Sequence, residues 1–334
     1  MEDIPVTGLD ELDKHLDDLV QDSTIPLNAK LIDDVELQLT ESNTPPLVIR
    51  FLPRLTTVLK QYPSDPTVLA NLASKLLRPV SFTQILSLAS PESLIQALEA
   101  PSPSANLLAM TVLHKATASP SLLSDMPDLL AAFVRRWLAS PFVEVGQLGG
   151  KVLADLLEAD RNGKLWRLLF THGEPIYTLL VDLCVGRHPD THDDAHQLSL
   201  AQARLLRVLP RIASLNLSAV ASAEPPSTST SNGHRPGGLL QFAALRMVDK
   251  SDRLLHLNLV DFFKGLVVVM RTEAAEAFTV ETIRPLLVEA MAEDELLREE
   301  LVKLPEEMVE EEVEGMRAWL QNLVPGQVWE VPLR

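Results

Sequence analysis

Apolar residues recur along the chain at the three- and four-residue spacing of one face of an α-helix. The pattern is clear in two successive segments: Leu9, Leu12, Leu16 and Leu19, and then Leu27, Leu31, Val35 and Leu39. Acidic and other polar residues fill the positions between them. This spacing predicts amphipathic helices that each bury one face and leave the other in water.

Short polar links, many with a proline, separate the helical segments. Proline at a first helical turn loses no hydrogen bond and presets φ, so Pro26, Pro45 and Pro66 predict helix starts. Pro53 lies inside a segment and predicts a kink. The remaining helices are expected to begin near Ser81, Pro91, Ser104, Met126, Val143, Lys164, Pro175, Thr191, Leu239, Ser251, Phe278 and Pro305.

The period of the pattern predicts the fold class. Two helices with their links take about 40 residues, which is the period of HEAT and armadillo repeats. No alternating strand pattern is sustained, and residues 265–270, the one β-like stretch, continue the helical spacing of the residues before them. Aromatic residues are only 4% of the chain, which favours helices packed through Leu and Ala. We predict an all-α solenoid of the HEAT/armadillo kind, built from stacked antiparallel helix pairs.

One segment interrupts the helical pattern. Residues 218–238 are rich in Pro, Ser, Thr and Gly and have little to bury in a core. Such composition predicts a disordered loop. We therefore expect a helical-repeat array over residues 1–217, a disordered loop over residues 218–238, and a second array with an acidic end over residues 239–334.

The net charge of −17 is concentrated at the two ends of the chain. Residues 1–36 and residues 293–314 each contain eleven acidic residues against two basic ones, so the remainder is close to neutral. Acidic ends repel a phosphate backbone, which argues against direct nucleic-acid binding. The single cysteine, Cys184, is expected to be buried and fits a reducing compartment. The acidic start does not have the form of a signal peptide, and no apolar run has the length of a membrane span. These features predict a protein of the cytoplasm, the nucleus or both.

Two motifs are candidate sites of chemistry. The run from Gly146 to Lys151 resembles a phosphate-binding loop only faintly, because it lacks the Gly-Lys-Ser/Thr ending and follows no strand, so helix packing is the better interpretation. His188, His192 and His196, with Asp190, Asp193 and Asp194, form a metal-like cluster in which His192 and His196, four residues apart on one helix face, could share a zinc ion. The favoured alternative is structural, with Thr191 capping a helix whose first turn carries the aspartates. No constellation specifies a nucleophile or a general acid, so we expect neither an enzyme nor a bound cofactor.

A basic strip is the candidate binding site. Arg204, Arg207 and Arg211 lie at helical spacing, opposite an apolar face that includes Leu205 and Leu209. Arg135, Arg136 and Arg167 precede them by one or two repeats. Stacked helices would align several of these side chains, and arginine is favoured at protein interfaces. A merely solvated face is the alternative. Trp137 and Trp166 are expected in the core.

The middle of the chain resembles a known family. The likeness is carried by residues 143–146, 151–158 and 165–170, and it is strongest from about Ser140 to Asp182. These residues resemble the fungal chaperones that assemble the proteasome regulatory particle, a family first named for a DNA mismatch repair phenotype and related to animal proteasome non-ATPase regulatory subunit 5. The resemblance implies a HEAT-like solenoid whose concave face binds the C-terminal domain of one base ATPase. It also implies a chaperone that is absent from the finished proteasome and is a monomer when free.

Two other functions share the same sequence features. A HEAT-repeat scaffold or adaptor for transport or signalling would show the same helical pattern. A mismatch repair accessory factor is suggested by the family's first name, although the charge argues against direct contact with DNA.

Overall fold

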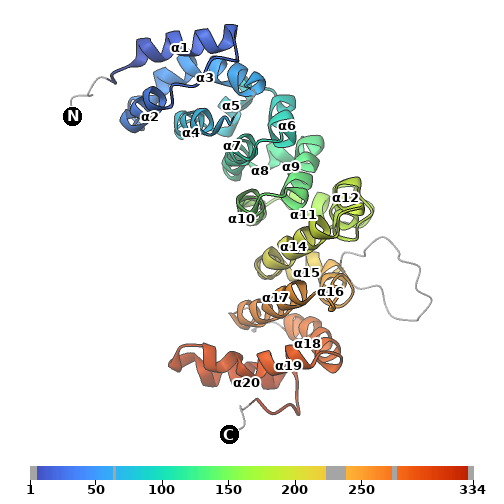
Figure 1. The fold of residues 1–334 in the computed structure, drawn as a ribbon. Helices are drawn as coiled ribbons and strands as arrows, with labels where there is room; N and C mark the ends of the chain where they lie inside the picture. The colour runs from blue at the N-terminus through green and yellow to red at the C-terminus, as the bar shows by residue number, and fades with distance from the viewer. Residues whose placement is uncertain (1–5, 63–64, 223–237, 273–276, 330–334) are drawn as a thin grey trace. The chain divides into compact units, whose positions relative to one another are not determined.

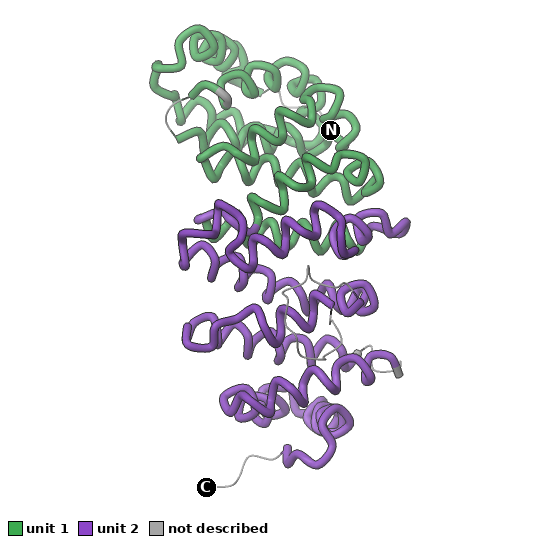
Figure 2. Tube along the Cα trace, turned by 90° about the vertical axis from the view of Figure 1, so that its right-hand side faces the viewer, with its two compact units in different colours: residues 1–137, 142–159 green, residues 138–141, 160–334 purple. Residues whose placement is uncertain are grey.

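The structure, a computed structural model, describes residues 6–62, 65–222, 238–272 and 277–329. More than half of these residues are helical, and no strand occurs among them (Figure 1). The predicted all-α class is confirmed. The chain divides into two compact units, residues 1–137 with 142–159 and residues 138–141 with 160–334 (Figure 2).

Unit 1 consists of short helices that stack in successive layers. Its central row is α2, α4, α7 and α10, each packed on the next, and α1, α3 and α6 cover this row. The helices are α1 (Leu9–Gln21), α2 (Ala29–Gln38), α3 (Thr44–Gln61), α4 (Thr67–Leu76), α5 (Phe82–Leu88), α6 (Pro91–Glu99), α7 (Pro103–His114), η1 (Lys115–Ala118), α8 (Pro120–Ser124), α9 (Pro127–Ala139) and α10 (Val143–Ala159).

Unit 2 repeats the arrangement with longer helices. Its central pair is α14 and α17, which share the largest helix contact of the unit, and α19 continues the row. The helices are α11 (Lys164–Phe170), α12 (Pro175–Cys184), α13 (Pro189–His192), α14 (Ala195–Leu215), α15 (Leu217–Ser222), α16 (Leu239–Leu245), α17 (Arg253–Thr272), α18 (Ala277–Ala292), α19 (Glu295–Lys303), η2 (Leu304–Glu307), η3 (Glu310–Glu312) and α20 (Val313–Leu323). No single helix among the described residues meets the length and apolarity of a membrane span, although the bent pair Lys164–Phe170 and Pro175–His192 passes on length and composition.

Polar contacts between successive repeats display the predicted period. Side chains on one helix reach acceptors on a neighbouring helix 37 to 43 residues away in the sequence. Within unit 1, His114 Nε2 lies 2.8 Å from Asp155 Oδ2, a separation of 41 residues. Within unit 2, His256 and Asp294 lie 38 residues apart and Arg271 and Glu312 lie 41 apart. Within each unit, polar links of this kind join neighbouring repeats in addition to their apolar packing, as in a solenoid.

Most predicted helix starts lie within two residues of an observed start, and the exceptions have physical causes. The acidic run before Trp319 forms the two 3₁₀ turns η2 and η3, and α20 begins only at Val313. Helix α19 was not predicted; its N-cap is Asp294, whose carboxylate accepts the Leu297 N–H. Residues 265–270 lie within α17, so the β-like stretch is helical.

The predicted division of the chain at residues 218–238 is not where the compact units separate. Most of that segment lies outside the described residues, and its first five residues belong to α15. Helix α15 packs on α16, and the Gly238 N–H donates to Ala221 O at 3.1 Å. The helices on both sides of the segment therefore belong to unit 2. Whether two helices share a compact unit depends on their packing against each other and not on the composition of the loop that joins them.

Candidate partner-binding surfaces

The six arginines of the predicted strip fall on both units. Arg135 and Arg136 lie on α9 in unit 1, whereas Arg167 lies on α11 and the other three on α14 in unit 2.

Arg135 and Arg136 bind the C-terminal end of α6. Arg135 forms an ion pair with Glu99, and Arg136 Nε donates to Leu98 O. Asn106 of α7 is fully buried and donates to Ala97 O and Leu98 O at 2.9 and 3.0 Å. The last carbonyls of a helix lack partners within the helix and carry partial negative charge, so guanidinium and amide donors stabilise them. These two arginines thus have a structural task in holding α9 to α6.

Arg204 is less exposed than its place opposite the apolar face of the helix predicted. Its side chain is half-buried, and Nη1 donates to Leu138 O at 2.9 Å within unit 2. Burial lowers the pKa of the Arg204 guanidinium to about 10. The residue therefore stays charged at neutral pH and links α14 to the chain segment at Leu138. The prediction that all three arginines of α14 lie clear of the packed surface is wrong for Arg204, because the last turn of α9, at Leu138, lies against its side chain.

Arg207, Arg211 and Arg167 are exposed or half-exposed, as predicted. Among the described residues, no hydrogen bond or ion pair engages the Arg207 side chain, which stands on the outer side of α14. Arg167 lines a shallow recess of about 620 Å³ with Trp166, Phe170 and Asn216, between α11 and α15. Three of the four predicted arginines of unit 2 are therefore exposed, Arg167 on α11 and Arg207 and Arg211 on α14.

We expect Arg204 and Arg207 to respond differently to removal of the side chain. Arg204→Ala deletes a donor to Leu138 O and the buried part of a long side chain, so the free energy of unfolding should fall by about 1–2 kcal/mol. Arg207→Ala removes an exposed side chain without a partner in the described chain and should change it by less than about 0.5 kcal/mol. Urea unfolding of both variants beside the parent measures this. If Arg204→Ala lowers the free energy of unfolding as little as is expected for Arg207→Ala, Arg204 has no structural role.

The exposed side of α14 continues onto α17, because the two helices run parallel. Ser199 Oγ donates to Asp252 Oδ2 at 3.3 Å near their N-terminal ends, and Gly265 lies against Pro210 further along. These contacts join residues 53 and 55 positions apart. The two contacts fix the register of the helices along their common length.

Between these two contacts, a residue of α14 corresponds to the residue of α17 that lies about 54 positions later in the sequence. With this offset, Leu200, Ala203 and Arg207 lie at the same heights along the helix pair as Leu254, Leu257 and Asp261. Because successive repeats stack in the same way, we expect exposed residues at equal heights on the two helices to lie on one side of unit 2.

Sequence reasoning missed the two leucines of α17. Leu254 and Leu257 are 76% and 49% exposed, whereas Leu255 and Leu259 of the same helix are buried. The signal was present, because Leu254 and Leu257 fall off the apolar spacing of Leu255, Leu259 and Phe262. Apolar residues outside a helix's own buried stripe are candidates for an interface.

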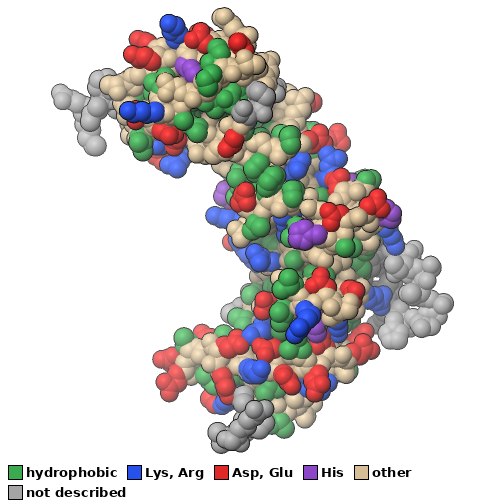
Figure 3. Space-filling model, viewed as in Figure 1, with side chains coloured by type: hydrophobic (Ala, Val, Ile, Leu, Met, Phe, Trp, Pro, Cys, Tyr) green, Lys and Arg blue, Asp and Glu red, His purple; other side chains and the backbone are tan. Residues whose placement is uncertain are grey.

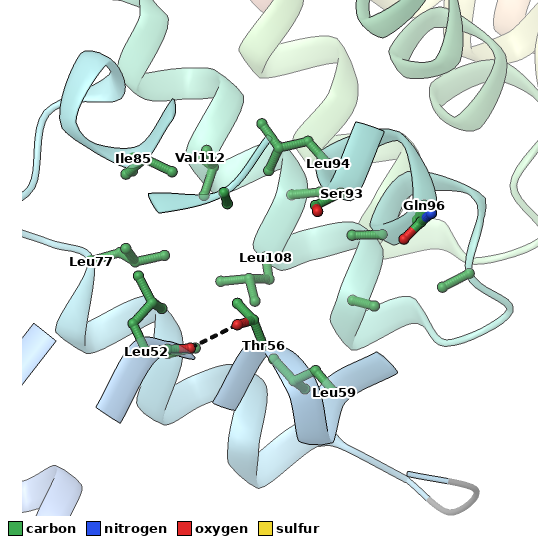
Figure 4. Close-up of a pocket in the computed structure, with 16 residues that line it drawn as sticks. Leu52, Thr56, Leu59, Leu77, Ile85, Ser93, Leu94, Gln96, Leu108 and Val112 are labelled. Carbon is green, nitrogen blue, oxygen red and sulfur yellow. Dashed lines mark hydrogen bonds between the residues drawn. The ribbon is translucent and has the colours of Figure 1, made fainter. Parts of the chain in front are cut away.

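A half-enclosed apolar pocket lies within unit 1 (Figure 4). Its volume is about 250 Å³, and side chains from five helices, α3 to α7, line it. In the view of Figure 4, Leu108 of α7 lies between Leu94 of α6 and the α3 residues Leu52 and Leu59. Thr56 Oγ1 donates to Leu52 O at 2.9 Å, so this hydroxyl is satisfied within its own helix. The pocket suits uncharged groups.

Two side chains of the histidine cluster form hydrogen bonds with nearby backbone groups. His188 Nδ1 accepts the Asp190 N–H at 3.2 Å, and His192 Nδ1 lies 2.7 Å from Gly186 O. Asp194, not Thr191, caps the following helix, because its carboxylate accepts the N–H groups of His196 and Gln197. Thr191 is buried within α13. No group of metal-ligand side chains was found in the described parts of the chain.

The other residues singled out in the sequence are buried or lie within packed helices. Gly146 to Lys151 lie inside α10, where Gly149 meets the ring of Trp137. Cys184 is fully buried, and burial raises the pKa of its thiol to about 12. Trp137 and Trp166 are 0% and 8% exposed, which confirms their place in the core.

Charge is distributed unevenly over unit 2. Asp and Glu side chains cover much of the region of α20, whereas Lys and Arg side chains are visible over α14 (Figure 3). Lys264 and Arg271 of α17 are paired with Glu307 and Glu312.

Residues 9–136 match the family model for the N-terminal domain of the DNA mismatch repair protein HSM3. This is the family that the sequence resembles, so the resemblance is confirmed over these residues. The matched region ends just before the segment from Ser140 to Asp182 that carried the likeness. No curated protein matches the chain significantly.

Proposed function

We propose, taking the match of residues 9–136 to this family as the premise, that the chain is a chaperone for assembly of the proteasome regulatory particle. In this proposal it binds the C-terminal domain of one base ATPase and helps the ATPase ring to assemble. It acts in the cytoplasm, with access to the nucleus, and leaves before the particle is complete.

The family match is the observation that carries the proposal, and the fold supports it. Stacked helices give an extended surface without requiring a deep site, and such surfaces serve protein recognition. The exposed arginines of α14 are a residue type that interfaces favour, and the exposed leucines of α17 add apolar surface beside them. The chain therefore acts by binding.

A role as a mismatch repair accessory factor is the second candidate, because the printed name of the family is that of a mismatch repair protein. The net charge of −17 disfavours contact with phosphates, so such a role would operate through another protein. A general transport or signalling adaptor is the third candidate.

Co-purification separates these functions. The tagged full chain should recover base ATPase subunits of the proteasome without the subunits of the mature core particle. Recovery of repair proteins or transport factors in the absence of ATPase subunits would contradict the proposal. A tagged unrelated HEAT-repeat protein serves as the control for capture by an exposed helical surface.

A further inference from the structure

We propose that Arg207 and Arg211 of α14, together with Leu254 and Leu257 of α17, form a single docking face for an acidic amphipathic helix of the partner. We call these four residues the α14–α17 face. The inference rests on the proposed function and names the surface of this chain that performs it.

The apolar half of the face is formed by the two leucines. Both project from α17 into solvent, three residues apart, so they lie on one side of that helix. In the parallel register of the two helices, their neighbours on α14 are Leu200 and Ala203, which are half-buried. These two side chains extend the apolar surface from α17 onto α14, so an incoming aliphatic side chain can pack against both helices.

The basic half lies two turns further along the same helices. Arg207 and Arg211 are both exposed, four residues apart on one side of α14. No carboxylate of the described chain pairs with Arg207, whereas Lys264 and Arg271 on the neighbouring helix are paired with acids. Asp261 lies at the same height on α17, but no ion pair joins its carboxylate to Arg207. An exposed guanidinium that no carboxylate of the described chain pairs with favours a partner that supplies one.

The two halves together specify the shape of the partner. Leu200 to Arg211 span about 16 Å along α14, at the usual rise per residue. A partner helix of about three turns covers this length, with aliphatic residues over Leu254 and Leu257 and carboxylates over the arginines. Arg–carboxylate contacts of this kind are charge-assisted and fix the orientation of the bound helix.

The test uses the full-length chain and purified C-terminal domains of the base ATPases, with affinity measured by calorimetry. Leu257→Ser and Arg207→Glu should each weaken binding of the ATPase domain about 30-fold, the loss expected for an interface anchor. Val288→Ser and Arg246→Glu are the matched controls, because both side chains are exposed in unit 2 away from this face. They should leave the affinity within about twofold.

The salt dependence tests the charge of the partner. Raising the salt from about 0.05 M to about 0.5 M should weaken binding by the parent more than binding by Arg207→Glu. Unchanged melting temperatures confirm that the variants fold. If the parent binds an ATPase domain and the face variants bind equally well, the docking face is wrong and the proposed function stands. If the parent binds no ATPase domain, both are wrong.

Discussion

Replacing Gly149 with alanine should lower the free energy of unfolding by about 2–3 kcal/mol. A Cβ at this position would lie 2.6 Å from Trp137 Cδ1 and 2.8 Å from Cγ, well inside van der Waals contact. Trp137 is fully buried, so its ring has no free space into which to move. Alanine is otherwise favoured over glycine in a helix by about 1 kcal/mol, and the expected loss is the overlap less this gain.

Gly265 is the matched control, because it also lies within a long helix. A Cβ there would lie 3.6 Å from Pro210 Cγ, an ordinary contact. Gly265→Ala should therefore raise the free energy of unfolding by about 0.5–1 kcal/mol. Urea unfolding followed by circular dichroism measures both. Stabilisation by both substitutions would show that Gly149 is not in close contact with Trp137.

Asp294→Ala should cost about 3 kcal/mol, because one buried carboxylate serves three partners. It accepts the Leu297 N–H as the N-cap of α19, and its Oδ2 lies 2.8 Å from His256 Nε2 and 3.2 Å from Lys250 Nζ. The side chain is only 2% exposed. Alanine removes the cap and leaves the donors of His256 and Lys250 without their acceptor. Asp261→Ala, which removes an exposed carboxylate of α17, is the control and should change stability by less than about 0.5 kcal/mol.

The same carboxylate predicts a dependence on pH. Burial by itself raises the pKa of Asp294, but the hydrogen bonds from Leu297, His256 and Lys250 outweigh it, so the pKa lies below its ordinary value of 3.8. A carboxyl with a lowered pKa in the folded state stabilises the fold above its unfolded pKa, and this contribution is lost as pH falls through the folded pKa. The difference in stability between the parent and Asp294→Ala should therefore be full at pH 7 and shrink below about pH 4. A constant difference down to about pH 2 would contradict this assignment.

The sequence predicted the helices well where a local signal marks their start. Pro91 and Pro175 begin α6 and α12, and Ser81 caps α5 with its partner Gln84. Prolines also occur inside helices, at Pro210 and Pro285, where no sequence rule separates them from helix starts. Helix α19 was missed because residues 293–314 were considered only for their charge, although Asp294 is its N-cap.

The candidate site was predicted in part, and the errors concern neighbours that one helix cannot reveal. Helical spacing placed Arg207 and Arg211 on the exposed side correctly, but it gave Arg204 the same exposure. The structure brings Leu138 O against Arg204, a contact between residues 66 positions apart. The leucines of α17 were missed for the same reason, since their place beside α14 follows only from the parallel register of the two helices.

Direct binding to an ATPase domain is the measurement closest to the central claim. The purified full-length chain is titrated with the isolated C-terminal domain of each base ATPase and, separately, with a mismatched DNA duplex. We expect one ATPase domain to bind one-to-one with Kd about 1 μM or tighter. The other ATPase domains should bind at least about tenfold more weakly, and the DNA should not bind at physiological salt. Binding to the duplex with no binding to any ATPase domain would contradict the account.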